Sequence, residues 1–143
     1  MPAIKILNPG EDYSEAMKVR YAVFVEEQGV PYENEADEYD KSAYHAVIID
    51  REAPIACGRI YFKDGSAKLG RVAVLKEYRC RGHAIKICDA LINIAVSHNL
   101  KKIILHSQTY AVPLYEKLGF KCEGDEFLEE AMPHYKMALE LVE

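Results

Sequence analysis

Hydrophobic and polar positions along the chain alternate between short strand-like runs and longer helical repeats. Residues 3–7 form a short apolar run that ends at an Asn-Pro-Gly turn, which predicts a first strand. From residue 13 to residue 24 the apolar positions recur at helical spacing, so this segment is predicted to form a helix with one buried face, preceded by the capping residue Asp12. Residues 29–41 break the pattern, because they are acidic and have almost no apolar periodicity.

Three further strands are predicted between residues 44 and 74. The apolar runs 44–50 and 55–62 are joined by a short connection, which predicts a hairpin. Asp64-Gly65 is a strong hairpin signal and returns the chain into the run 67–74. These strands are therefore expected to form an antiparallel meander.

A long amphipathic helix is predicted to begin near Gly82 and to end near Asn99, because its apolar residues recur along one broad face. The apolar run 103–106 follows, so this strand and the strand before the helix form a parallel crossover. A second helix is predicted at 111–118, and final strands at about 120–123 and 134–141. The order of elements indicates one mixed α/β domain that spans residues 1–143.

Composition narrows the class of protein. A chain of 143 residues, half of them hydrophobic, can bury the core of one domain. The net charge of −5 argues against a nucleic-acid partner. No segment resembles a signal peptide or a membrane span, so a cytoplasmic protein without a membrane partner is expected. The cysteines and histidines lack metal-ligand spacing, so no metal is expected.

The junction between the strand 67–74 and the following helix has the features of an anion site. The first N–H groups of a helix lack intrahelical partners and carry the positive end of its dipole. Arg79 and Arg81 add positive charge there, and Gly82 and Ala84 leave room for a close ligand. Alone, this pattern is equally compatible with an ordinary helix entry.

The acidic segment 29–41 also has two interpretations. Acidic loops are usually solvated surface. Here the acids are interleaved with Tyr32 and Tyr39, whose flat rings could wall a negatively charged mouth that attracts a cation. The second interpretation predicts a role in substrate binding.

Two motifs resemble the GNAT superfamily of N-acetyltransferases. Arg79-x-x-Gly82-x-Ala84, after Val-Ala-Val, is similar to that family's acyl-CoA pyrophosphate loop, Q/R-x-x-G-x-G/A. The segment 108–120 is similar to its N-x-x-A-x-x-L-Y-x-K-x-G-F motif, although Gln108 replaces the usual asparagine. The resemblance covers nearly the whole chain and implies a mostly antiparallel sheet of about six to seven strands with a central parallel pair and helices on both faces.

Other residues resemble the ElaA-like branch of this superfamily. They comprise Arg20 to Gln28, Glu35-x-Asp37-x-x-Asp40 and Pro133-His134. Similar elements occur in acyl-homoserine lactone synthases, which share the fold. Those enzymes usually carry a tryptophan that this chain lacks, so the synthase is a minor alternative.

The resemblance implies an acetyl-CoA-dependent N-acetyltransferase that acts on a small amine. Tyr115 would protonate the leaving thiolate, and the base would be one of Glu27, Glu35, His106 and His134. The predicted cofactor contacts are Val72, Ala73, Val74, Arg79, Cys80, Arg81, Gly82, His83, Ala84, Gln108 and Tyr115. The predicted substrate contacts are Tyr32, Glu35, Asp37 and Asp40.

An acyl-CoA-binding sensor without turnover is the alternative from another class. The sequence does not identify the acceptor amine or other usable acyl groups. It does not report the oligomeric state, although a homodimer is compatible with the family.

Overall fold

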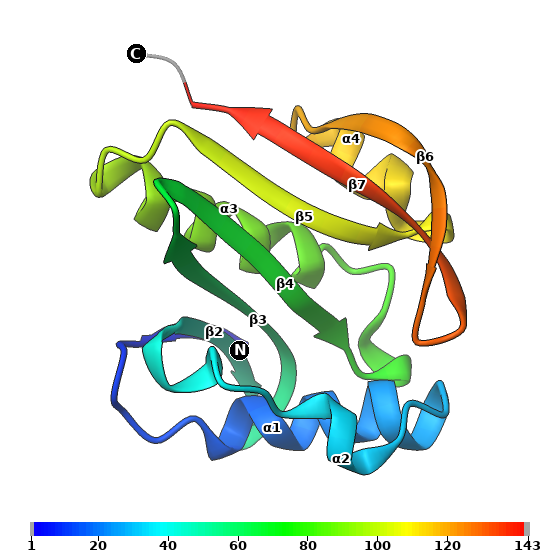
Figure 1. Ribbon diagram of the computed structural model, residues 1–143. Helices are drawn as coiled ribbons and strands as arrows, with labels where there is room; N and C mark the ends of the chain where they lie inside the picture. The colour runs from blue at the N-terminus through cyan, green and yellow to red at the C-terminus, as the bar shows by residue number, and fades with distance from the viewer. Residues whose placement is uncertain (1, 142–143) are drawn as a thin grey trace.

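Seven strands form one sheet in the order β1-β2-β3-β4-β5-β7-β6, as the computed structural model of residues 2–141 shows (Figure 1). Only β4 and β5 pair in parallel; all other neighbours are antiparallel. The predicted mixed sheet with a central parallel pair is confirmed. Met1 and residues 142–143 of the predicted domain lie outside the described residues. The strands are β1 (Ala3–Leu7), β2 (Tyr44–Asp50), β3 (Ala53–Lys63), β4 (Ser66–Val74), β5 (Lys102–Gln108), β6 (Lys121–Glu129) and β7 (Met132–Glu140).

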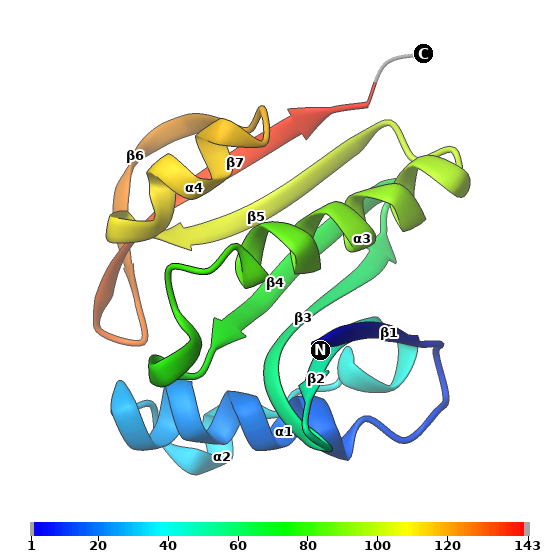
Figure 2. The same ribbon diagram turned by 180° about the vertical axis from the view of Figure 1, so that it is seen from behind.

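Helices cover both faces of the sheet, as predicted. Val47, Cys57 and Ala73 pack under the first helix, α1, and its continuation η1. Their strand neighbours, such as Ala46 and Ala56, point to the opposite face and join the core beneath α3. Figure 2 shows α3 and α4 together over the strands on that face. The helices are α1 (Ser14–Arg20), the π-helix η1 (Tyr21–Glu27), α2 (Tyr32–Glu35), α3 (His83–Ser97) and α4 (Val112–Lys117), with short 3₁₀ turns η2 (Asp40–Ser42), η3 (Lys76–Tyr78) and η4 (Thr109–Ala111).

Two local predictions need correction. Asp12 accepts a hydrogen bond from the Ser14 N–H at 2.9 Å, but the residue in the capping position of α1 is Tyr13. The last hairpin is longer than predicted, because β6 extends to Glu129 and turns through Glu130 and Ala131. Both turn residues have positive φ (50° and 63°), although neither is glycine or asparagine. The residue types at this position therefore do not predict a hairpin turn.

Gly58 of β3 lies where α3 packs most closely on the sheet. A Cβ atom at this position would lie 2.6 Å from Ile87 Cγ2 and 3.1 Å from Leu91 Cδ1, both in the core. We expect Gly58→Ala to lower the free energy of unfolding by about 1–3 kcal/mol, because the added methyl overpacks this contact. Urea denaturation measures the change.

Gly70→Ala in the neighbouring strand is the matched control, because a Cβ atom there meets nothing within 4 Å. Equal losses of stability in the two variants would contradict the overpacking argument.

Candidate active site

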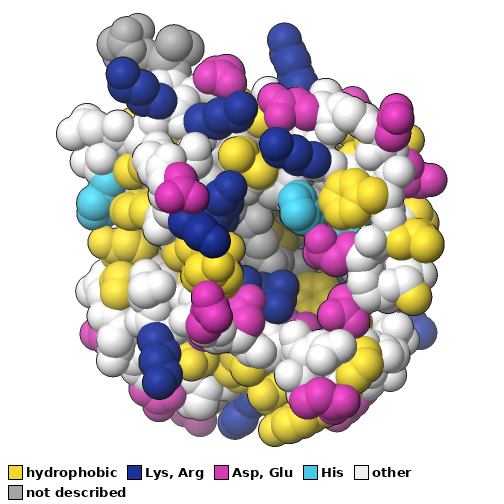
Figure 3. Space-filling model, viewed as in Figure 1, with side chains coloured by type: hydrophobic (Ala, Val, Ile, Leu, Met, Phe, Trp, Pro, Cys, Tyr) yellow, Lys and Arg dark blue, Asp and Glu magenta, His cyan; other side chains and the backbone are white. Residues whose placement is uncertain are grey.

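The two parallel strands separate soon after they pair, and a cavity occupies the gap. Ala67 pairs with Ile103 and Lys68 with Ile104, and no later pairing joins these strands within the described residues. The cavity has a volume of about 550 Å³ and is lined from one face of the sheet by α3 and α4 and from the other by η1 and α2. Figure 3 shows a hollow near the centre of one face, with basic, acidic and histidine side chains around it. The cavity therefore reaches both faces through the sheet.

The end of β4 directs a backbone donor into this gap. The Leu75 N–H donates to the Ile55 carbonyl at 2.9 Å, so Val74 and Ala56 form the non-hydrogen-bonded type of antiparallel pair. The Val74 N–H consequently points away from β3 and toward β5. Val72, Ala73 and Val74 all line the cavity.

Unpaired backbone donors surround the start of α3. The N–H groups of residues 80–85 donate to no carbonyl or side chain within residues 2–141. Cys80 and Gly82 have positive φ (64° and 83°), which curves the loop, and a Cβ atom at Gly82 would meet nothing within 4 Å. Such a curved run of N–H groups at a helix N-terminus fits a phosphate or pyrophosphate.

The residues predicted to bind the cofactor gather at this cavity with one exception. His83, Ala84 and Gln108 line it together with the loop and strand residues described above. Arg81 does not line it, because its guanidinium lies over the Tyr78 ring, 5.6 Å from the centroid.

Arg79 is held by protein groups on both sides. Its Nε donates to the Val74 carbonyl at 2.9 Å, and its two terminal nitrogens each contact one oxygen of Glu27 at 2.6 Å. The hydrogen bonds from Arg79 lower the pKa of Glu27. Glu27 does not line the cavity, and both its oxygens are engaged, which does not suit a proton acceptor.

Tyr115 on α4 lines the cavity from the side of the sheet that carries α3. Its ring packs edge-on against Phe120 with centroids 5.9 Å apart. Its hydroxyl makes no hydrogen bond to residues 2–141, and burial raises the pKa of Tyr115 well above the ordinary phenol value. The phenol is therefore protonated near neutral pH, and its hydroxyl is free to donate into the cavity.

Two histidines line the opposite side of the cavity. His106 on β5 contacts Glu129 with Nδ1 at 2.8 Å, and His134 on β7 contacts the Met132 carbonyl with Nδ1 at 2.8 Å. A carboxylate or a carbonyl only accepts, so each Nδ1 donates and a neutral ring keeps its lone pair on Nε2. Hydrogen bonding to His106 lowers the pKa of Glu129. Glu129, which also lines the cavity, was not predicted from the sequence.

The acidic segment forms a buried ion-pair cluster with Arg20, Arg59 and Arg71. Asp40 accepts from Arg20 Nη1 at 2.6 Å and from Arg59 Nη1 at 2.7 Å. Glu35 Oε2 lies 3.0 Å from Arg20 Nε and 2.9 Å from Arg71 Nε. Asp37 forms a fork with Arg59, at 2.6 and 2.7 Å.

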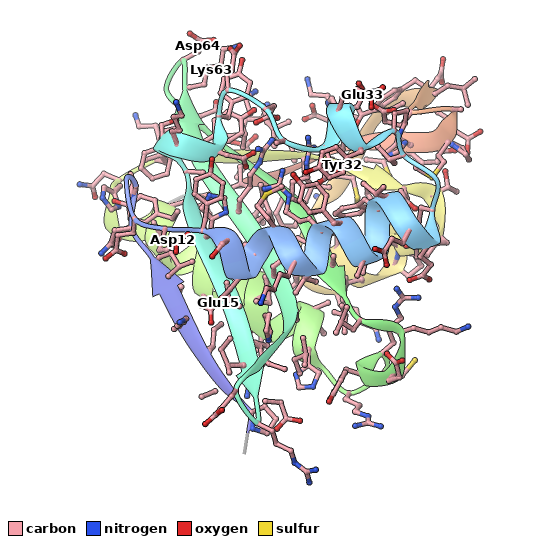
Figure 4. The ribbon with its side chains drawn as sticks, turned by 90° about the horizontal axis from the view of Figure 1, so that it is seen from below. Asp12, Glu15, Tyr32, Glu33, Lys63 and Asp64 are labelled. Atoms are coloured by element: carbon pink, nitrogen blue, oxygen red, sulfur yellow. The ribbon has the colours of Figure 1, made fainter. Side chains whose placement is uncertain are left out.

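The predicted open acidic mouth is therefore wrong for these acids, because the arginines balance their charge. Asp37 and Asp40 do not line the cavity, whereas Glu35 does. Burial raises the pKa of Glu35 against the opposing charges of Arg71 and Arg20. Tyr32 is exposed on α2 beside the first helix (Figure 4), stacks on Tyr21 with centroids 4.7 Å apart and does not line the cavity.

Two side-chain contacts connect the elements on opposite sides of the gap. Gln108 Nε2 donates to Gln28 Oε1 at 2.8 Å, which joins the end of β5 to the residue after η1. Asn34 Nδ2 donates to Glu130 Oε1 at 3.3 Å, which joins α2 to the tip of the last hairpin. Gln28, Asn34 and Glu130 line the cavity. Gln28 ends the segment that resembles the ElaA-like branch, whereas Asn34 and Glu130 carry no motif that could identify them from the sequence.

No helix within residues 2–141 is both long and apolar enough to cross a bilayer. The same residues contain no group of three or more His, Cys, Asp or Glu side chains arranged to hold a metal ion.

Comparisons with known proteins agree with this geometry. A family model described as an acetyltransferase (GNAT) domain matches residues 11–141. The uncharacterized N-acetyltransferase YjcF of Bacillus subtilis is 41% identical over 128 residues, which cover 89% of this chain and 91% of that protein. The crystal structure of Escherichia coli ElaA has a TM-score of 0.88 at 25% identity and covers 98% of this chain and 100% of its own. A GNAT family acetyltransferase from Elizabethkingia anophelis, solved with acetyl-CoA bound, shares the fold, with a TM-score of 0.72, 16% identity and 98% coverage of each chain.

Proposed function

This chain belongs to the GNAT family of acetyltransferases, and from that premise we propose that it transfers an acetyl group from acetyl-CoA to a small amine. The observation that carries the proposal is the gap between β4 and β5. One cavity there collects the unpaired N–H groups before α3, the inward-pointing Val74 N–H and the Tyr115 hydroxyl. These are the groups that a thioester donor with a pyrophosphate requires.

The donor fits this side of the cavity by charge and by shape. The N–H groups of residues 80–84 would bind the pyrophosphate, and the open edge of Val72 to Val74 would pair with the pantetheine amides as a strand does. Arg79 Nε donates to the Val74 carbonyl at 2.9 Å, so its guanidinium orients the Val74–Leu75 peptide at the end of β4. The solved relative with acetyl-CoA supports this assignment through its fold.

The reaction forms one C–N bond and breaks one C–S bond. The amine lone pair attacks the thioester carbonyl carbon, and the Val74 N–H stabilises the negative charge that develops on the carbonyl oxygen. Tyr115 donates a proton to the departing thiolate, and a base takes the proton that the amine loses. The products are an acetamide and CoA thiol.

His106 is the proposed base among the predicted candidates. It lies on β5, which borders the gap, and Glu129 fixes its ring with Nε2 left to accept a proton. His134 lies one strand farther from the gap, and both oxygens of Glu27 are engaged by Arg79. One Glu35 oxygen is held by two arginines.

Tyr115→Phe is expected to lower kcat at least about tenfold, because the thiolate then leaves without a proton donor. The dissociation constant for acetyl-CoA should change little, since the phenol contributes one hydrogen bond late in the reaction. Thiol release and calorimetric titration measure the two quantities. Unchanged turnover would remove Tyr115 from the mechanism.

The proposed function is tested by thiol release from acetyl-CoA with a panel of polyamines, amino sugars and amino acids. Acceptor-dependent release with formation of the acetamide supports it. Acetyl-CoA binding without turnover across the panel would favour the acyl-CoA sensor instead. Lactone formation from S-adenosylmethionine would favour the synthase alternative.

A further inference from the structure

Arg71 is the arginine of the ion-pair cluster that also lines the cavity. It lies at a β-bulge, where β4 gains one residue against β3 between Gly70 and Ala73. Its φ of 55° is uncommon for a residue with a side chain. Backbone conformations of this kind persist where the surroundings hold them, and they concentrate at ligand sites.

The Arg71 guanidinium is only partly used by the protein. Its Nε and Nη2 contact Glu35 and Asp37 at 2.9 to 3.3 Å. Its Nη1 donates to no group within residues 2–141, and 26% of the side chain remains exposed. Arg20 and Arg59, by contrast, are buried and do not line the cavity.

Glu35 offers the opposite charge at the same place. Only 4% of its side chain is exposed, and both arginine contacts use Oε2. Oε1 has no hydrogen-bond partner within residues 2–141, although the residue lines the cavity. This oxygen is therefore free to accept a hydrogen bond from a donor in the cavity.

The two side chains are adjacent, since Arg71 Nε and Glu35 Oε2 lie 2.9 Å apart. A guanidinium N–H binds a carboxylate, and a carboxylate oxygen binds an ammonium group. An amine that carries a carboxylate on the neighbouring carbon likewise presents both charges side by side. The positive charge of Arg71 also contributes to the low pKa of Glu129, after the hydrogen bond from His106, so Arg71 lies near the proposed base.

We propose that the acceptor is an α-amino acid or a molecule with an α-amino acid end, whose carboxylate binds Arg71 and whose amino group is oriented by Glu35. This inference rests on the proposed function and specifies its substrate class. The reaction itself is unchanged, because the same amine attacks the same thioester. Glu35 and Arg71 select and orient the acceptor, and His106 takes the proton.

The test uses the wild-type chain and matched sets of acceptors. Each set contains an L-amino acid, its carboxamide and the amine that lacks the carboxyl group, with thiol release from acetyl-CoA as the readout. We expect kcat/KM for the best amino acid to exceed that of its carboxamide and its decarboxylated amine by roughly tenfold to a hundredfold, the usual value of a hydrogen bond to a charged group.

Variants of Arg71 test whether this residue causes the preference for an amino acid over its carboxamide and its decarboxylated amine. Arg71→Gln should remove most of the preference for the amino acid by raising its KM, and should leave the KM for acetyl-CoA unchanged. Arg71→Lys should restore part of the preference, because it keeps the charge. Lys136→Gln, which removes a cation outside the cavity from β7 on the far side of β5, should leave the preference intact.

Each result decides between the two proposals. Equal or faster acetylation of the amines without a carboxylate would overturn the amino-acid inference and would keep the acetyltransferase function. Binding of acetyl-CoA without acetylation of any acceptor would overturn both. If the Arg71 variants fail to fold, the preference of the wild-type protein among matched acceptors still decides the inference.

Discussion

His106→Ala is expected to lower kcat/KM for the acceptor by at least about a hundredfold near neutral pH, the usual contribution of a positioned general base. The amine is protonated at this pH, and the variant has no group on β5 to accept its proton. The KM for acetyl-CoA should stay within about twofold, because the histidine lies on the acceptor side of the cavity. Steady-state kinetics over a range of pH provide both numbers.

Glu129→Gln distinguishes a base from a structural histidine. In the wild type, the Glu129 carboxylate accepts from His106 Nδ1 at 2.8 Å. The amide oxygen of the variant can still accept this hydrogen bond, but it cannot stabilise the imidazolium by charge. The variant should therefore lower kcat/KM by less than His106→Ala does, because the ring stays oriented. His134→Ala is the matched control on the same cavity and should keep most of the wild-type rate. A larger loss in His134→Ala than in His106→Ala would assign the base to His134.

Asp40→Asn is expected to lower the free energy of unfolding by about 3–5 kcal/mol, the usual cost of removing one partner from a buried ion pair. Asp40 accepts hydrogen bonds from Arg20, Arg59 and the Asp37 N–H, and it is almost fully buried. The amide would leave two buried guanidinium groups without full compensation. Urea denaturation at pH 7 measures the loss, and Asp89→Asn on the exposed side of α3 should change stability by less than about 0.5 kcal/mol.

The same carboxylate predicts the response of stability to acid. Burial opposes ionisation of Asp40, but the hydrogen bond and the charge of Arg20 outweigh it and hold the pKa of Asp40 well below its usual range. A carboxyl group with a depressed pKa in the folded state stabilises the fold above its unfolded pKa of about 4. We therefore expect the advantage of the wild type over Asp40→Asn to be complete near neutral pH and to decline as the pH falls below about 4. An advantage that is independent of pH would contradict an ionised Asp40.

The elements that depend on local pattern could be predicted from the sequence. The hairpin at Asp64-Gly65 and the long helix after Gly82 are found where periodicity and turn residues place them. The loop before α3 could be assigned as an anion site, because its small residues and its position before a helix are local properties. These signals sufficed for the fold, and the anion site before α3 stays a prediction.

The acceptor side could not be predicted in the same way, because its contacts join distant parts of the chain. Glu35, Asp37 and Asp40 are neutralised by arginines that lie on α1, β3 and β4. Nothing in the local sequence around Arg71 indicates its positive φ, and Glu129 meets His106 only through the register of the last hairpin. The charges along the sequence therefore predicted an open acidic loop, whereas in the folded protein these acids form ion pairs with arginines from other elements.

The short parallel pairing of β4 with β5 also has a consequence for how the protein unfolds. Within residues 2–141, two register pairs between β4 and β5 join the β1 to β4 half of the sheet to the β5 to β7 half by strand pairing. Amide hydrogens at the open ends of these two strands should exchange with solvent deuterium faster than those in the middle of β3. A donor that occupies the gap as an additional strand would slow this exchange in both halves at once, so acetyl-CoA should act as a mechanical link that makes the two halves unfold together.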